Sequence, residues 1–254
     1  MPANQQHKIV GLIGANSPGG MSVGASNEWS LVIHFAAWRY PGMPVVEREL
    51  RIEMPVDSRD QLDGYMRSLR PYQVIEVEGG DDGERLKRVD AITRVDVVDP
   101  ELEAIAARLQ APVEIDHPLF GKLVYDRRYN WFSGHTTWNQ EPVEITLACE
   151  DPDHPECALA TADALFQDEI GWLIRVQDYA VARLLELKND TWIEDDEEVV
   201  SRDEFISRMT LETIAIDAAG NFTFWHDDGD LFWGHVIEIR GDLTNGPTHA
   251  GIAG

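Results

Sequence analysis

The stretch Leu-Glu-Thr-Ile-Ala-Ile-Asp-Ala-Ala-Gly-Asn-Phe-Thr-Phe-Trp-His-Asp, residues 211–227, indicates two strands joined by a tight turn. Apolar and polar side chains alternate on both sides of Ala219-Gly220-Asn221, which is the period of a strand with one buried face. Gly and Asn favour a turn because both tolerate a positive φ. A third strand is expected over residues 235–241, after the turn Asp228-Gly229-Asp230. These three segments form one set of predicted strands at the end of the chain.

Upstream elements place this sheet in an α+β domain. Three more strands are predicted, around Lys122–Asp126, Tyr129–Trp138 and Pro142–Cys149. Residues 155–189 then carry apolar side chains at helical spacing, with a bend expected at Gly171. A short helix is expected after the capping box Ser201-Arg-Asp-Glu204, which comes after the acidic run 194–198. The order sheet, helices, sheet predicts an α+β domain over residues 112–254.

The first 111 residues are expected to form a separate, small and mainly antiparallel β domain. Its strands are predicted around His7–Gly14, Trp29–Phe35, Val46–Met54, Tyr72–Glu78 and Leu86–Val97. The composition of residues 17–20 favours a loop, and the glycine-rich residues 79–83 favour a hairpin connection. Two helices are expected, one capped by Ser58 and stopped by Pro71, the other capped by Asp99 and ending at Ala111.

Acidic residues dominate the second half of the chain. The whole chain has 21 Lys and Arg against 46 Asp and Glu, a net charge of −25. Residues 1–111 contribute 12 basic and 17 acidic side chains, so residues 112–254 contribute 9 and 29, a net charge of −20. Such a field opposes binding to phosphate backbones, and we expect no nucleic-acid partner. It favours encounter with a basic protein, although acidity can also serve solubility alone.

The sequence predicts a cytoplasmic protein with no membrane partner. The longest apolar stretches, such as residues 31–38, are well short of the ~20 residues that a membrane span needs. The N-terminus lacks the charged and apolar regions of a secretory signal. With Cys149 and Cys157 as the two cysteines, no disulfide framework is implied.

The densest group of reactive side chains comprises His226, Asp227, Asp228, Asp230 and His235. Imidazoles and carboxylates are common ligands of zinc, manganese and iron, so a metal site is one interpretation. The spacing matches no zinc-hydrolase or calcium-loop pattern, and Asp-Gly-Asp is also the composition of a tight turn. We favour the turn, leave the identity of any metal open and expect no cofactor.

Aromatic residues gather in the C-terminal half: Trp131, Trp138, Trp192, Trp225, Trp233, Phe222, Phe224 and Phe232. Most are expected in the core, because large rings supply much of a small domain's buried area. The minority interpretation is an aromatic binding face. If a binding site exists, we expect it to use Trp225, Asp228, Asp230, Trp233 and His235.

Several segments carry a family resemblance: Pro118-Leu-Phe-Gly121, Trp131-Phe-Ser-Gly134, Leu184-Leu-Glu-Leu187 with Asn189 and Trp192, Phe205, Leu211-Glu-Thr-Ile214, Asp228-Gly-Asp-Leu-Phe-Trp-Gly-His235 and Gly251-Ile-Ala-Gly254. Over residues 114–254 the chain resembles the bacterial domain-of-unknown-function family DUF2262. The run 228–235 is the most specific part. The resemblance implies a domain assignment without a catalytic residue, and by analogy with small acidic domains beside toxins it suggests an immunity-like role.

The sequence therefore favours a non-enzymatic, acidic protein-binding or immunity-like protein whose partner is a basic protein or toxin. The alternative is a metal-dependent enzyme that uses His226, Asp228, Asp230 and His235. The oligomeric state is not predicted by any of these patterns.

Overall fold

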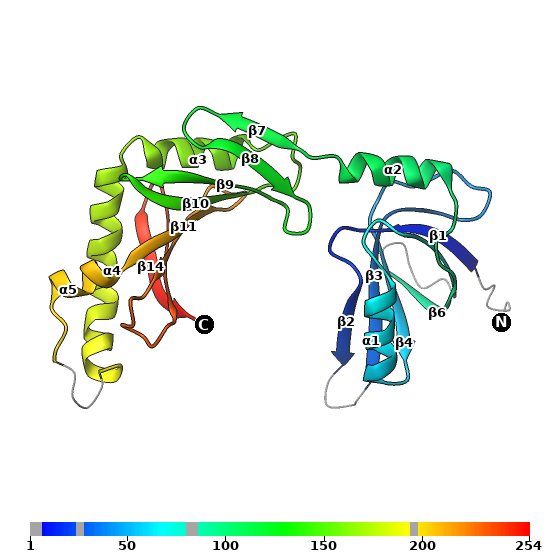
Figure 1. The fold of residues 1–254 in the computed structure, drawn as a ribbon, viewed down its shortest axis with the longest axis horizontal. Helices are drawn as coiled ribbons and strands as arrows, with labels where there is room; N and C mark the ends of the chain where they lie inside the picture. The colour runs from blue at the N-terminus through cyan, green and yellow to red at the C-terminus, as the bar shows by residue number, and fades with distance from the viewer. Residues whose placement is uncertain (1–6, 24–27, 80–85, 194–197) are drawn as a thin grey trace. The chain divides into compact units, whose positions relative to one another are not determined.

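The chain forms two compact units, Met1–Ala111 and Pro112–Gly254. The computed structural model describes residues 7–23, 28–79, 86–193 and 198–254. Each unit has its own sheet and its own helices, so the predicted α+β class is confirmed (Figure 1).

The N-terminal unit is a small barrel. Its strands are β1 (His7–Ile13), β2 (Gly19–Val23), β3 (Glu28–Arg39), β4 (Leu50–Val56), β5 (Val74–Gly79) and β6 (Leu86–Arg94). They lie in the order β1-β5-β6-β4-β3-β2, and a further pairing between β1 and β3 closes the barrel. β1 and β2 pair with opposite halves of β3 and act as one bent first strand. With a helix between β4 and β5 and a parallel β4–β6 pair, this is the topology of the five-stranded OB-type barrel.

Both helices of this unit begin at the predicted caps. α1 (Arg59–Ser68) starts after Ser58, whose hydroxyl accepts the Gln61 backbone N–H at 3.2 Å. α2 (Pro100–Gln110) starts after Asp99, whose carboxylate accepts the Leu102 N–H at 3.2 Å. A short polar side chain at this position satisfies an amide that the helix leaves unpaired.

Two predictions for this unit are wrong in detail. Gly19 and Gly20 begin strand β2 and do not form a loop, and a Cβ atom at Gly20 would lie 2.7 Å from the Leu62 side chain of α1, so glycine at this position lets the helix approach the strand. The strand predicted from Val46 starts only at Leu50, because Val46 makes one isolated bridge to Trp38. Of the predicted hairpin connection 79–83, Gly79 ends β5 and residues 80–83 lie outside the described residues.

The C-terminal unit is built on one eight-stranded sheet. Its strands are β7 (Glu114–His117), β8 (Gly121–Asp126), β9 (Trp131–Trp138), β10 (Glu141–Ala148), β11 (Thr210–Ile216), β12 (Phe222–Asp227), β13 (Val236–Asp242) and β14 (Gly246–Ala253). They succeed each other in sequence order across the sheet, and every pair is antiparallel except β10–β11. The two predicted sets of strands therefore join into one sheet, because a helical crossover lets β11 pair in parallel with β10.

Three helices form that crossover: α3 (Glu156–Phe166), α4 (Glu169–Thr191) and α5 (Arg202–Arg208). The predicted bend at Gly171 is wrong by a few residues. The break falls at residues 167–168, and Asp168 caps α4 by accepting the Gly171 N–H at 3.2 Å. Of the predicted acidic run 194–198, residues 194–197 lie outside the described residues. None of the helices in the described ranges is long and apolar enough to cross a membrane.

The core of this unit lies between the helices and one face of the sheet. Ile145, Ile214, Phe224 and Ile239 stand opposite one another on β10 to β13 and form a buried row. Trp172 of α4 packs edge to face on Phe222, with ring centroids 5.1 Å apart. Large aromatic contacts of this kind hold the helix layer on the sheet.

Candidate functional site

The loop 228–235, which joins β12 to β13, is organised around a buried aspartate. The Asp228 side chain is 1% exposed and accepts three backbone N–H groups, from Asp230 at 3.1 Å, Phe232 at 2.6 Å and Gly234 at 3.2 Å. Amides that point at one carboxylate satisfy its charge without a cation. The favoured turn interpretation therefore describes the role of Asp228 in this structure.

The loop holds Trp233 towards solvent in an unusual backbone conformation. Trp233 is 58% exposed and has a φ of +60°, and Asp230 has a φ of +63°. A bulky residue rarely adopts the left-handed region, and such strain persists only where the surroundings impose it. Leu231 and Phe232 are fully buried beside it, so the loop is anchored next to its exposed tip.

Trp233 belongs to an aromatic cluster that joins the loop to the end of α4. Trp192 lies 4.8 Å from Trp233, 5.6 Å from Phe232 and 5.3 Å from His235, between ring centroids. His235 Nδ1 donates to the Phe232 carbonyl at 2.6 Å, which assigns the proton to this nitrogen because a carbonyl can only accept. Trp192 and Trp233 together form the aromatic part of the candidate site.

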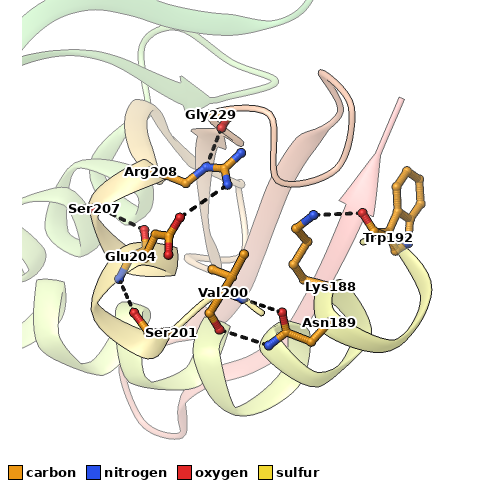
Figure 2. Close-up of polar contacts among 9 residues, drawn as sticks. All are labelled: Lys188, Asn189, Trp192, Val200, Ser201, Glu204, Ser207, Arg208 and Gly229. Carbon is orange, nitrogen blue, oxygen red and sulfur yellow. Dashed lines mark hydrogen bonds and ion pairs between the residues drawn. The ribbon is translucent and has the colours of Figure 1, made fainter. Parts of the chain in front are cut away.

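Polar contacts beneath the loop fix the segments that carry it (Figure 2). Asn189 of α4 exchanges two hydrogen bonds with the Val200 backbone, at 2.9 and 3.0 Å. The fully buried Lys188 donates from Nζ to the Trp192 carbonyl at 2.8 Å. Arg208 of α5 donates from Nε to the Gly229 carbonyl at 2.8 Å. These contacts tie α4, the segment before α5 and the loop into one support.

The five residues predicted to bind do not form one site. Asp228, Asp230, Trp233 and His235 belong to the same loop. Trp225 lies on β12 opposite Thr213 and Glu238, and its neighbour His226 is buried in the core. Because successive strand residues point to opposite faces, Trp225 lies on the face of the sheet away from the helices.

Three of the four residues of the metal-dependent alternative have other environments in the described part of the chain. His226 is 3% exposed, and burial lowers its pKa to about 4, so it is neutral in the core. The carboxylate of Asp228 accepts three amides, and His235 donates to a carbonyl. Within the described ranges, no three His, Cys, Asp or Glu side chains are grouped to hold a metal ion.

Sequence reasoning did not assign Trp192, Asn189 or Arg208 to the site. Trp192 and Arg208 lie far from the loop in sequence and contact it because the crossover helices return to the sheet, whereas Asn189 bonds the Val200 backbone. Asn189 and Trp192 were among the residues of the family resemblance, which was the available signal. Arg208 had no such signal.

The acidic side chains of this unit are distributed over strands, helices and turns. Some are paired locally, including Asp126 with Arg128, Asp178 with Arg202 and Glu238 with Arg240. Asp217 and Asp242 accept amides of their own turns. The negative charge therefore acts as a general field around the unit, and the described residues do not concentrate it at the Trp233 loop.

The N-terminal barrel has a cavity of its own, of about 520 Å³. Residues of β2, β3, β4 and β6 line it, among them Met21, Trp29 and Arg88. Glu28, Glu53 and Asp57 add three carboxylates to the lining against the one guanidinium of Arg88, which is unfavourable for phosphate groups.

Comparisons with known proteins agree with the two-unit organisation of the chain. The profile of a domain of unknown function, DUF7021, matches residues 2–109. The profile of DUF2262, described as an uncharacterized protein conserved in bacteria, matches residues 117–252. No curated protein matches the chain. Since the second match spans more than half of the chain and includes the whole Trp233 loop, the protein belongs to the DUF2262 family.

Proposed function

We propose that the protein is a non-enzymatic binding protein of the immunity type, which holds a basic partner protein through the Trp233 loop. The observation that carries the proposal is an exposed tryptophan on a loop that is anchored by the buried residues Asp228, Leu231 and Phe232. Tryptophan is among the residues that contribute most to protein interfaces, because its large ring fills a pocket in the partner.

The loop suits this role because it is already in place before a partner binds. Asp228 and Arg208 hold its backbone, and Trp192 supports one side of the Trp233 ring. A rigid anchor loses little conformational entropy on binding, so more of its contact energy appears as affinity.

The charge of the C-terminal unit would act at longer range. A net charge of −20 over residues 112–254 attracts a cationic protein and raises its association rate. Because the carboxylates are spread over the unit, the field favours basic partners in general. The Trp233 loop would then select among them.

A pull-down with two matched tryptophan variants tests the proposal. Wild type, Trp233→Ala and Trp225→Ala are immobilised and exposed to lysate of the native bacterium at about 50 mM and about 1 M salt. We expect a basic protein to bind wild type and Trp225→Ala at low salt, to be lost from Trp233→Ala and to weaken at high salt. Equal capture by both variants, or no specific capture, would contradict the proposal.

A further inference from the structure

The two edges of the eight-stranded sheet are built differently (Figure 1). β7, at one edge, has four residues and carries the acidic side chains Glu114 and Asp116. β14, at the other, has eight residues and contains no Asp, Glu, Lys or Arg. Proteins usually protect edge strands by keeping them short, by charging them or by placing proline or a bulge in them, since an open edge pairs with other chains. β7 is both short and charged. In β14 the proline and the bulge lie at residues 247–248, and residues 249–253 carry none of these features.

β14 is held in strand conformation with one side unpaired. Its partner is β13, in a continuous register from Ala253 opposite Val236 to His249 opposite Arg240, after which the register shifts and Pro247 stands opposite Gly241. Ala250 and Ile252 pack against the core, so the strand is anchored through its side chains. Within the described residues, no strand pairs with its other edge. The edge is therefore a preformed template for one further strand.

The open edge continues into the candidate site. Ala253, the last residue of β14, lies opposite Val236, the first residue after the Trp233 loop. A Cβ atom placed on Gly254 would lie 3.0 Å from the His235 ring. An extended segment that paired along β14 would thus reach the loop that carries Trp233.

Charge decides which strand would fit this edge. A second copy of the chain would bring a net charge of −25 against −25, which opposes self-pairing. Asp227 stands in register with Val236 and Ala253 but lies two strands inside the edge, where its Oδ1 accepts the Gly229 N–H at 2.9 Å. Positively charged side chains on an incoming strand would therefore be attracted by the net charge of −20 of the whole unit.

We infer that β14 is a docking edge at which an extended strand of the basic partner protein adds to the sheet. Main-chain hydrogen bonds along residues 249–253, beyond Pro247 and the register shift, supply affinity, and the Trp233 loop at the end of the edge supplies specificity. This inference rests on the proposed function and specifies how that partner is held.

Hydrogen exchange of the full-length protein tests the inference with synthetic peptides as probes. One peptide alternates lysine and valine, and its control alternates glutamate and valine. We expect the lysine peptide to slow exchange of outward-facing amides in residues 249–253 by about tenfold, and the glutamate peptide to leave them unchanged. No slowing by the lysine peptide, or equal slowing by both peptides, would overturn the inference.

Proline variants at two adjacent positions, His249→Pro and Ala250→Pro, provide the structural control. Neighbouring strand residues direct their N–H groups to opposite sides, so one proline disturbs pairing with β13 and the other removes an outward donor. The variant with the higher melting temperature has the outward proline, and we expect it to lose the peptide protection. Retained protection in that variant would overturn the inference.

Two further outcomes separate the edge from the proposed function. If the pull-down depends on Trp233 but not on the outward proline, the partner does not use β14 and only the edge inference fails. If nothing binds wild type, the proposed function fails as well. A dimer in light scattering that the outward proline abolishes would assign the edge to a second copy and overturn the choice of partner.

Discussion

Strand β12 is flanked by two turns in which an aspartate carboxylate accepts backbone N–H groups, but one aspartate is exposed and the other is buried. Before it, the exposed Asp217 accepts the backbone N–H groups of Ala219 at 2.8 Å and Asn221 at 2.9 Å. After it, the buried Asp228 accepts three N–H groups of its loop. The difference comes from the residues that follow each aspartate: small and polar ones in the first turn, the core residues Leu231 and Phe232 in the second. An Asp-Gly turn therefore becomes a rigid loop when apolar neighbours draw it into the core.

Removing the two aspartates should give the largest contrast between the turns. Asp228→Ala leaves three amides without their charged acceptor, in a buried or partly buried setting, and should lower the free energy of unfolding by about 4 kcal/mol. Asp217→Ala exposes its amides to water and should lower it by about 1 kcal/mol. Urea unfolding of both variants measures the difference. Equal losses would show that burial of the second turn has no energetic consequence.

The free energy of unfolding should also depend on pH, because the buried His226 lies two residues before Asp228 in the same strand-to-loop segment. Burial lowers the pKa of His226 from its usual 6.5 to about 4. Between these values the unfolded chain binds a proton that the folded chain excludes, so stability is full above pH 6.5 and falls as the pH decreases towards 4. The total loss should be about 3 kcal/mol.

Unfolding at a series of pH values measures this slope, with two variants for comparison. His226→Leu, which cannot titrate, should lose the part of the slope due to this residue. Ile237, the buried residue opposite His226 on β13, provides the control, and Ile237→Val, which changes no titratable group, should keep the wild-type slope. The same slope in wild type and His226→Leu would refute the assignment.

Glycines in the two turns should give the next largest difference. Both have a positive φ, +84° at Gly220 and +52° at Gly229. A Cβ atom at Gly229 would lie 2.5 Å from the Arg208 backbone carbonyl, whereas at Gly220 it would meet the Thr161 hydroxyl at 2.9 Å. A hydroxyl can move more easily than backbone, so Gly229→Ala should cost about 2 kcal/mol and Gly220→Ala about 1 kcal/mol. Thermal unfolding of both variants measures the two losses. A larger loss for Gly220→Ala would show that the Arg208 backbone can move away from the new side chain.

Local patterns predicted those parts of the fold that depend on neighbours in sequence. The caps at Ser58, Asp99 and Ser201 are present because one side chain and the amide three residues on suffice to form them. β14 was missed because its Gly, Pro and Ala content does not indicate a strand, and pairing with β13 imposes the conformation. The parallel β10–β11 pair was missed for a similar reason, since it joins segments separated by three helices.

The site was predicted in the same partial way. The turn at Asp228 could be predicted from its sequence, but the depth of that aspartate depends on α5 and on Trp192, which are distant in sequence. The separation of Trp225 from the loop could have been predicted from strand alternation, because its neighbours Phe224 and His226 are core residues. The exposure of Trp233 could not, because it depends on the left-handed backbone at this residue and on the burial of Leu231 and Phe232 beside it.

The smallest effect on stability is expected at Trp233, and this variant separates the role of the exposed side chain from the role of the buried Asp228 that holds the loop. Trp233→Gly removes a side chain that is 58% exposed and places glycine at a φ of +60°, where glycine is unstrained. Relief of strain offsets the lost contact with Trp192, so the free energy of unfolding should change by less than about 1 kcal/mol. Partner capture should nevertheless be lost, because the anchor is gone while Asp228 still holds the loop. A large loss of stability in urea unfolding would instead show that the Trp233 side chain stabilises the fold, and Trp233 would then be a structural residue.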